Sequence, residues 1–369
     1  MRIAVISSYG YWGQLDPRLL WEEGAEERQI GGGETAMLNC ASEWATQHGG
    51  NEVLLFCPCS PGHKYGIDFI PIDHFVPFIT SLDVDVLVAW DFPHAFRFAD
   101  RVKHRVLAFQ LNHAEVGVFS SVIDEYWHPS NWHRDRFCKL WPEIPVRHAF
   151  GDMTNGVDVS RYERVAQTDV RADHRVIYTS SPDRGLHHLL RFWPRVRDAV
   201  PDAELHVYYD IKRWLESNFE GEKNGYVLPT LDRAKYIAMV VQDPPPGITF
   251  FGGVSQGSLA KAQIGASVLC YPCDPVAPTE GFSMTVLEGI TAGCSVLTTN
   301  ADAFPELWSG VPGVQILPLP VQDDVWVDAL VKALQNGSPG RVTEFREHTW
   351  KSVGDRQLQH LRSLLNAAH

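Results

Sequence analysis

The sequence has 369 residues, of which 44% are hydrophobic and 21% are charged. This composition is typical of a globular protein, and the length exceeds that of one ordinary hydrophobic core, so we expect two domains. The formal net charge is −13. That balance argues against an extended basic surface and therefore against nucleic acid as a partner.

The cysteine content and the first residues favour a cytoplasmic location. The chain has seven cysteines, an odd number, and it begins with MRIAVISSYG, which enters a strand directly rather than a signal peptide. We therefore expect reduced thiols. No run of 18 apolar residues is present, so we expect no transmembrane segment, whereas peripheral membrane contact stays open.

Apolar runs in the first half predict strands that are buried on both faces. They cover residues 2–7, 52–57, 85–90 and 104–110. Residues 35–49 show helical spacing of apolar side chains between the first two strands. This alternation predicts a parallel sheet covered by helices.

A turn-rich stretch at residues 150–160 interrupts the pattern, which then restarts. Strands are expected at 175–180, 203–209, 247–252, 266–272 and 294–300, with a helix over 185–200, an insertion or helix pair over 213–246 and an amphipathic helix towards the C-terminus. We therefore predict two Rossmann-like domains, over 1–155 and 156–340, followed by a C-terminal helix over 341–369.

Residues 280–288 read EGFSMTVLE. Ser283 is a good N-cap, and apolar residues at helical spacing follow it as far as Gly293, so a helix is expected to begin there. Glu280 then lies in the preceding loop and Glu288 on the second turn. The free backbone amides beside these carboxylates predict a site for an anion that carries hydroxyls, such as a sugar diphosphate. These amides belong to Ser283, Met284 and Thr285.

Two further motifs follow predicted strands. IGGGET (30–35) precedes a helix, and Gly32 and Gly33 would let a phosphate or sugar approach bare backbone, although a flexible loop explains them equally well. The motif is not GxGxxG, so a dinucleotide fingerprint is absent. SSPDRGL (180–186) places Arg184 at the end of a strand, where it is either a cation for the diphosphate or a solvated surface charge.

In their order and spacing, these motifs resemble the retaining glycosyltransferases of family 4 (group 1). EGFSMTVLEGITAGCSVLTTNADAFPEL (280–307) is similar to the E-x7-E signature of that family, and SSPDRGL, NGVD (155–158) and GGGE (31–34) are similar to its donor, linker and acceptor-side segments. The resemblance implies the GT-B fold, with two parallel-sheet domains facing across a cleft and a C-terminal helix that returns to the first domain.

The resemblance also implies roles for individual residues. Glu288 would accept hydrogen bonds from the ribose hydroxyls, and Glu280 would face hydroxyls of the donor sugar. Arg184 would balance the leaving diphosphate, and His113 would point at the donor sugar near the reacting carbon. Donor-binding backbone is implied at Gly281, Phe282, Ser283, Met284 and Thr285.

The sequence departs from the family at Thr179, where a second basic residue is usual. Full neutralisation of the diphosphate would then require a substitute cation. The candidates are Lys212, Arg213 and Lys261.

The expected reaction moves a sugar from a nucleotide-diphosphate sugar to a hydroxyl acceptor by front-face displacement with retention, without a metal or other cofactor. Acceptor-side residues are Trp12, Asp91 and Asn112. The loop over 10–34 is acidic, which favours a neutral glycan or small molecule as the acceptor. A nucleotide-sugar epimerase, a glycan phosphorylase and a non-catalytic nucleotide-sugar-binding subunit are the alternatives.

Three possible metal motifs have simpler interpretations. Asp83 and Asp85 form a DxD pattern, but they lead into an apolar strand. The paired cysteines at 57–59 and 270–273 lie in different halves and are expected to be core thiols. The histidines of HPSNWHRDRF (128–137) are expected on a helix before the linker.

Overall fold

The computed structural model describes most of the chain, and the chain divides into two compact units. The described residues are 1–8, 15–22, 28–47, 50–110, 116, 119–142, 144, 149–152, 154–168, 170–226, 228–340 and 345–367. Unit 1 comprises Met1–Arg18, Ile30–Gly156 and Arg346–His369, and unit 2 comprises Leu19–Gln29 and Val157–Phe345. Residues 19–29 therefore group with unit 2, in contrast to the sequence-based boundary at residue 155.

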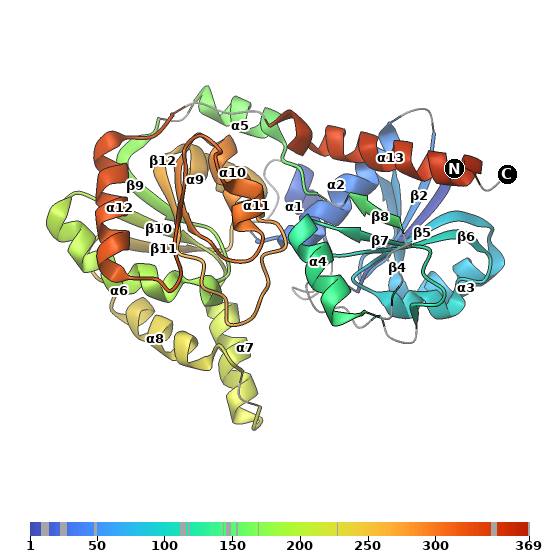
Figure 1. The fold of residues 1–369 in the computed structure, drawn as a ribbon, viewed down its shortest axis with the longest axis horizontal. Coiled ribbons are helices and arrows are strands. Elements are labelled where there is room, and N and C mark those ends of the chain that lie inside the picture. The colour runs from blue at the N-terminus through green and yellow to red at the C-terminus, as the bar shows by residue number, and fades with distance from the viewer. Residues whose placement is uncertain are drawn as a thin grey trace. The chain divides into compact units, whose positions relative to one another are not determined.

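Unit 1 contains an eight-stranded sheet in the order β3-β4-β2-β1-β5-β6-β7-β8, in which only the β3–β4 pair is antiparallel. The strands are β1 (Arg2–Ile6), β2 (Glu52–Cys57), β3 (Gly62–Lys64), β4 (Ile67–Pro71), β5 (Val84–Trp90), β6 (Val102–Ala108), β7 (Glu125–His128) and β8 (Ala149–Asp152). Figure 1 shows this sheet with helices on its faces.

Helices cover the sheet of unit 1 because alternate strand residues present apolar side chains to each face. They are α2 (Gly32–Thr46), α3 (Phe75–Ser81), α4 (Asn131–Leu140) and α13 (Trp350–Ala367), with 3-10 turns η1 (Ile72–His74), η2 (Pro93–Phe98) and η5 (Arg346–His348). The short helix α1 (Arg18–Trp21) has only its first residue in unit 1. The C-terminal helix α13 packs on α2, where Trp44 Nε1 donates to Gln357 Oε1 at 3.1 Å. The amphipathic C-terminal segment thus belongs to unit 1, as expected.

Unit 2 contains a six-stranded, fully parallel sheet in the order β11-β10-β9-β12-β13-β14. The strands are β9 (Ala172–Tyr178), β10 (Glu204–Tyr208), β11 (Ile248–Gly252), β12 (Ala266–Tyr271), β13 (Ser295–Thr299) and β14 (Val314–Leu317). The helices are α5 (Val159–Ala166), α6 (Leu186–Ala199), α7 (Ile211–Lys223), α8 (Leu231–Gln242), α9 (Gln256–Ile264), α10 (Met284–Thr291), α11 (Phe304–Trp308) and α12 (Asp323–Asn336), with the 3-10 turn η4 (Pro182–Arg184).

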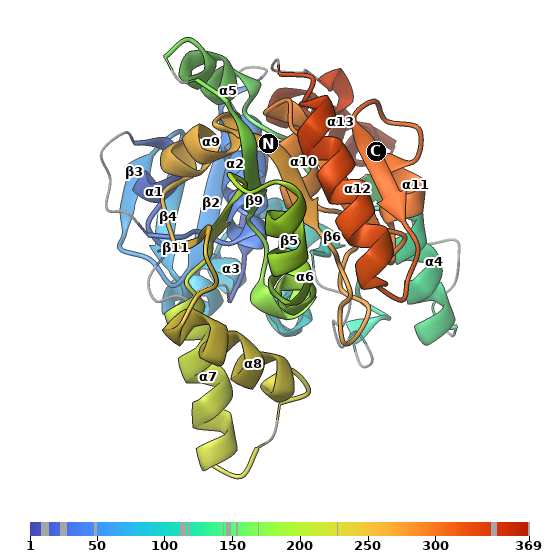
Figure 2. The ribbon, with the colours of Figure 1, turned by 90° about the vertical axis from the view of Figure 1, so that its left-hand side faces the viewer.

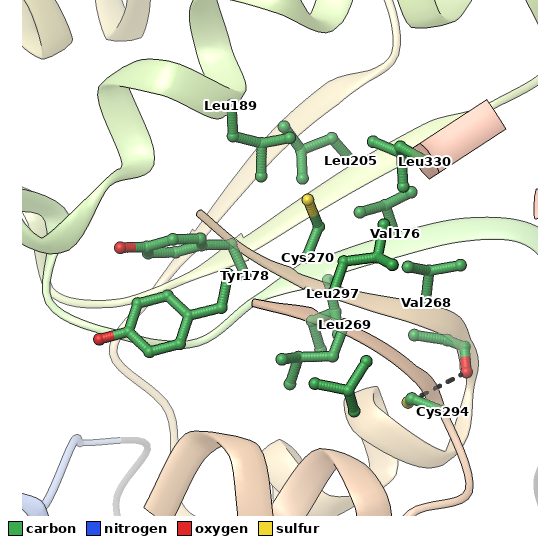
Figure 3. Packing of buried hydrophobic residues seen from close by; sticks show 14 of the residues in the cluster. Val176, Tyr178, Leu189, Leu205, Val268, Leu269, Cys270, Cys294, Leu297 and Leu330 are labelled. Carbon is green, nitrogen blue, oxygen red and sulfur yellow. Dashed lines mark hydrogen bonds between the residues drawn. The ribbon is translucent and has the colours of Figure 1, made fainter. Parts of the chain in front are cut away.

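The core of unit 2 is built from strands that are apolar on both faces. Every residue of β12 is buried. Figure 3 shows Leu189 of α6 and Leu330 of α12 packed with side chains of the central strands. The predicted insertion is a helix pair, α7 and α8, which projects from the rest of the unit (Figure 2).

The strands expected from continuous apolar runs are confirmed, with boundaries that differ by up to three residues. Five strands of three to five residues in the described part of the chain were missed: β3, β4, β7, β8 and β14. Strand β7 reads EYWH, and the carboxylate of its Glu125 is fully buried and pairs with His104 and His360. Among the helices that the structure describes, none has the length and apolar character that a membrane span requires.

Candidate functional site

Helix α10 begins where the sequence predicts. Ser283 has an extended backbone, with φ −152°, and its side chain accepts a hydrogen bond from the amide of Val286 at 3.4 Å. Gly293, with φ 79°, follows the end of the helix. Glu280 therefore lies in the loop before α10 and Glu288 lies inside the helix, so the amides of the first turn are flanked by both carboxylates.

Arg184 and Glu280 form a close ion pair next to this loop. The Nη1 of Arg184 lies 2.6 Å from Oε1 of Glu280, and the Tyr271 hydroxyl donates to the same oxygen at 3.1 Å. The Glu280 side chain is only 3% exposed, whereas that of Arg184 is 30% exposed. Burial raises the pKa of Glu280, and the opposing effects of Arg184 and the Tyr271 hydrogen bond favour its charged form.

The loop that carries Glu280 is held by Asp302. Its carboxylate accepts hydrogen bonds from the amides of Thr279 at 2.8 Å and of Glu280 at 3.0 Å. Asp302 itself has a positive φ of 48°. A non-glycine residue in this conformation costs free energy, so the surrounding contacts must hold it. The position of Glu280 is therefore set by its main chain as well as by its ion pair.

The turn that carries Arg184 requires glycine at the next position. Gly185 has φ 118°, and a Cβ at this position would lie 2.0 Å from the carbonyl oxygen of Pro272. The turn between β9 and α6 therefore lies in direct contact with the segment that follows β12. Because β9 and β12 are neighbours in the sheet, the two segments meet at its carboxyl edge.

Glu288 is a buried carboxyl with polar neighbours. The Nε2 of Gln263 donates to its Oε2 at 3.2 Å, and the hydroxyl of Tyr162 donates to Oε1 of Gln263 at 2.7 Å. Burial raises the pKa of Glu288 to about 7, while Gln263 and the charge of Arg161 act in the opposite direction. The sequence analysis missed Tyr162 and Gln263, because neither lies in a motif and the contact joins distant segments.

Phe282 in the loop and Thr285 in the first turn of α10 contact neighbouring segments. Phe282 is 6% exposed and meets the ring of Trp308 edge-on, with centroids 5.4 Å apart. Thr285 Oγ1 lies 3.5 Å from the carbonyl oxygen of Thr179. Position 179 therefore lies beside the first turn of α10. A basic residue at this position would be close to the expected anion, but the residue here is the neutral Thr179. Of the candidate substitutes, Lys212 is 87% exposed and lies 4.0 Å from Glu216.

His187, His188 and Asp274 bring possible metal ligands close together. However, His188 Nδ1 lies 3.0 Å from a guanidinium nitrogen of Arg191, which can only donate, and Nε2 lies 2.8 Å from Asp274. These partners assign the hydrogen of His188 to Nε2, so neither nitrogen retains a free lone pair for a metal. The adjacent guanidiniums of Arg191 and Arg233 also oppose a cation. The cluster fits a hydrogen-bonded network better than a metal site.

In unit 1, the glycine-rich segment leads into α2, whose first residues include Gly32 and Gly33. The carboxylate of Glu34 folds back over Gly31, since a Cβ on Gly31 would lie 2.2 Å from Oε2 of Glu34. Burial raises the pKa of Glu34. The Glu34 carboxyl therefore lies beside the N-terminus of α2. The donor-binding role of Gly32 and Gly33 stays a prediction.

Asp91 directly follows strand β5 and has a positive φ of 48°. Both of its carboxylate oxygens lie 3.1 Å from the amide of Gln110, and the Gln110 side chain is paired with that of Asn155. The sequence analysis missed Gln110, which follows β6. Trp12, Asn112 and His113 lie outside the described residues, so their roles stay predictions.

The discounted motifs have structural partners. Asp83 pairs with Arg101, and Asp85 pairs with Lys103 and the Arg2 amide, at the start of β5. The seven cysteines are free thiols, and six of them are buried. In the third motif, His128 and His133 contact each other, with 2.8 Å between their Nδ1 atoms.

Comparison with known proteins supports a glycosyltransferase. Residues 173–336, which contain Arg184, Glu280 and Glu288, match the family model described as glycosyl transferases group 1. No curated protein matches the chain in sequence.

Several solved structures are similar over nearly the whole chain. Anabaena Alr3699/HepE in complex with UDP and glucose has a TM-score of 0.66 and 12% identity, with 98% of this chain and 100% of that chain covered. AviGT4, a glycosyltransferase involved in avilamycin A biosynthesis, has a TM-score of 0.64 and 13% identity, with coverage of 100% and 98%. Sucrose-phosphate synthase from Thermosynechococcus elongatus has a TM-score of 0.63 and 13% identity, with 100% of both chains covered. These likenesses and the two parallel sheets confirm the predicted GT-B fold.

Proposed function

We propose that this chain is a retaining glycosyltransferase of family 4 that moves a sugar from a nucleoside diphosphate sugar to a hydroxyl acceptor. The group 1 match covers the segment in which Arg184, Glu280 and α10 meet. The similar Anabaena protein was solved with UDP and glucose, which supports a nucleotide-sugar donor for this chain as well.

The donor diphosphate would bind at the first turn of α10. Hydrogen bonds from its amides to a charged phosphate contribute about 1.5–3 kcal/mol each, before the cost of ordering the ligand. The helix dipole adds roughly 0.3–2 kcal/mol. Because position 179 is neutral, Arg184 would provide the main positive charge, and it reaches this edge of the sheet already paired with Glu280.

In the Arg184–Glu280 pair, the positive charge of the guanidinium balances the carboxylate, and a bound donor diphosphate would add negative charge beside it. A guanidinium presents five donors, so Arg184 can bind a diphosphate while it keeps its contact with Glu280. The second oxygen of Glu280 would accept hydrogen bonds from the donor sugar. Glu288 would accept hydrogen bonds from the ribose, which favour its charged form.

In the proposed reaction, the bond between the anomeric carbon and the leaving diphosphate oxygen breaks. The acceptor oxygen forms its bond to the same face of the sugar, and the acceptor proton passes to the leaving diphosphate. Arg184 would stabilise the negative charge that develops on that group. We propose that no metal is required, because the amides and the guanidinium supply the charge stabilisation.

The ion pair between Arg184 and Glu280 beside α10 is the observation that carries this proposal. The test supplies UDP-glucose and the corresponding GDP, ADP and dTDP sugars, with and without EDTA, to the protein and a panel of glycan and small-molecule acceptors. We expect acceptor-dependent release of one nucleoside diphosphate and a product whose anomeric configuration, measured by NMR, matches that of the donor. An inverted product would refute the retaining mechanism. Conversion of the donor sugar without an acceptor would indicate an epimerase, and EDTA-sensitive turnover would refute metal independence.

A further inference from the structure

The helix pair α7–α8 contributes a basic side chain to the turn that carries Arg184. Arg233, on the first turn of α8, donates through Nη1 to the carbonyl oxygens of both Asp183 and Asp274. Its Nη2 lies 3.6 Å from the Asp274 carboxylate, and its side chain is 19% exposed. One guanidinium therefore joins the turn after β9 to the segment after β12.

Asp274 is held from its other side by α6. His188 Nε2 lies 2.8 Å from Oδ2 of Asp274, and Arg191 contacts Nδ1 of the same histidine at 3.0 Å. Arg191 in turn pairs with Asp323 of α12 at 2.6 Å. Asp274 therefore lies in a continuous polar network, and its position is fixed independently of any ligand.

The same two segments also meet directly around Arg184. The amide of Asp274 donates to the carbonyl oxygen of Arg184 at 3.4 Å, and Gly185 lies against Pro272. Arg233 bonds to the residue that precedes Arg184. The residues before and after Arg184 are thus both linked to the segment after β12, Asp183 through Arg233 and Gly185 directly. The Arg184 side chain extends to Glu280.

We propose that Arg233 is a positioning residue for Arg184, so that the inserted helix pair is part of the donor site. Its planar guanidinium holds two carbonyl oxygens at once, and this fixes the turn from which Arg184 reaches Glu280 and the donor diphosphate. This inference rests on the proposed function. It assigns the helix pair a role in the efficiency of transfer. Arg233 would act through Arg184, because its own guanidinium already contacts the Asp274 carboxylate and two carbonyl oxygens of the chain.

A double-variant cycle tests this role, with kcat and the Kd for a nucleoside diphosphate as readouts. The probe is whichever of UDP, GDP, ADP and dTDP binds the wild-type protein, and the matching nucleoside serves as a second ligand. Arg233→Gln is expected to lower kcat roughly ten- to a hundredfold, because small displacements of a catalytic group have effects of that size. It should weaken binding of the diphosphate and leave binding of the nucleoside unchanged. In a protein that already carries Arg184→Gln, Arg233→Gln should lower kcat by a smaller factor than it does in the wild-type protein.

Arg195→Gln is the matched control, because Arg195 lies on α6 in an exposed ion pair with Asp324. It should change neither readout. Arg233→Lys retains the charge without the planar fork, so an intermediate kcat is expected, and this variant serves if Arg233→Gln does not fold.

Full additivity with Arg184→Gln, or equal weakening of nucleoside and diphosphate binding, would refute the positioning role while leaving the proposed function intact. Absence of nucleoside diphosphate binding by the wild-type protein would instead refute both.

Discussion

Glu288→Gln should change how the stability of the protein depends on pH. Burial raises the pKa of Glu288 to about 7 from an ordinary value of 4.5. The folded protein therefore favours the protonated carboxyl. Below pH 4.5 the group is protonated in both states and has no effect, whereas between pH 4.5 and 7 the unfolded chain loses the proton more readily. Stability is consequently lost as the pH rises through this window.

The size of the effect follows from the two pKa values. At about 1.4 kcal/mol for each pKa unit, the wild-type protein loses about 3 kcal/mol of unfolding free energy between pH 4.5 and pH 8. Glutamine does not ionise and keeps an oxygen that can accept from Gln263. Between pH 4.5 and pH 8, the unfolding free energy of the variant should therefore rise by about 3 kcal/mol relative to that of the wild type. For a unit of this size, that corresponds to a change of roughly 6–12 °C in the difference between their melting temperatures.

The assay is thermal unfolding of both proteins at half-unit steps from pH 4.5 to pH 8, without nucleotide. The test uses only how the difference between the two melting temperatures changes with pH, so any effect of the substitution that does not depend on pH cancels. Glu216→Gln, in an exposed pair with Lys212, controls for the loss of a surface carboxylate. A difference that does not change with pH, or that moves in favour of the wild type as the pH rises, would refute the assigned environment of Glu288.

Two further predictions concern the turn after β9. Arg184→Ala should lower turnover by about 2.7–4 kcal/mol of transition-state stabilisation, as for other groups that stabilise developing charge, and steady-state kinetics with the identified donor would measure it; a near-normal rate would point to another cation. Gly185→Ala should destabilise unit 2 by more than about 1 kcal/mol, because the new Cβ would meet the Pro272 carbonyl oxygen at 2.0 Å and the φ of 118° disfavours alanine. Denaturant unfolding measures this loss, and an unchanged midpoint would contradict the close contact.

The central strands could be predicted because continuous apolar runs are a strong local signal for strands that are buried on both faces. The N-cap at Ser283 and the glycine after α10 are also local signals, and the structure has both. Strand β7 could not be predicted in this way. Its Glu125 is stabilised by histidines 21 residues before it and 235 residues after it, and a single sequence does not reveal such pairing.

The site was predictable to a similar extent. Glu280, Glu288 and Arg184 are the informative positions of recognisable motifs, whereas no local pattern indicates which residues support them. Gln263 is 25 residues from Glu288, and Asp302 is 22 residues from Glu280, so these contacts depend on how the strands are ordered in the sheet. Arg233 lies in the insertion over 213–246, where no motif points to a function.

The position of the donor diphosphate is the central claim, and a crystal structure of the protein with an intact nucleoside diphosphate sugar tests it most directly. We expect phosphate oxygens within hydrogen-bonding distance of the backbone amides of Ser283 and Met284 and of the Arg184 guanidinium, with the ribose hydroxyls at Glu288. A donor bound at another edge of the sheet, or phosphates that do not contact this turn of α10, would contradict the account.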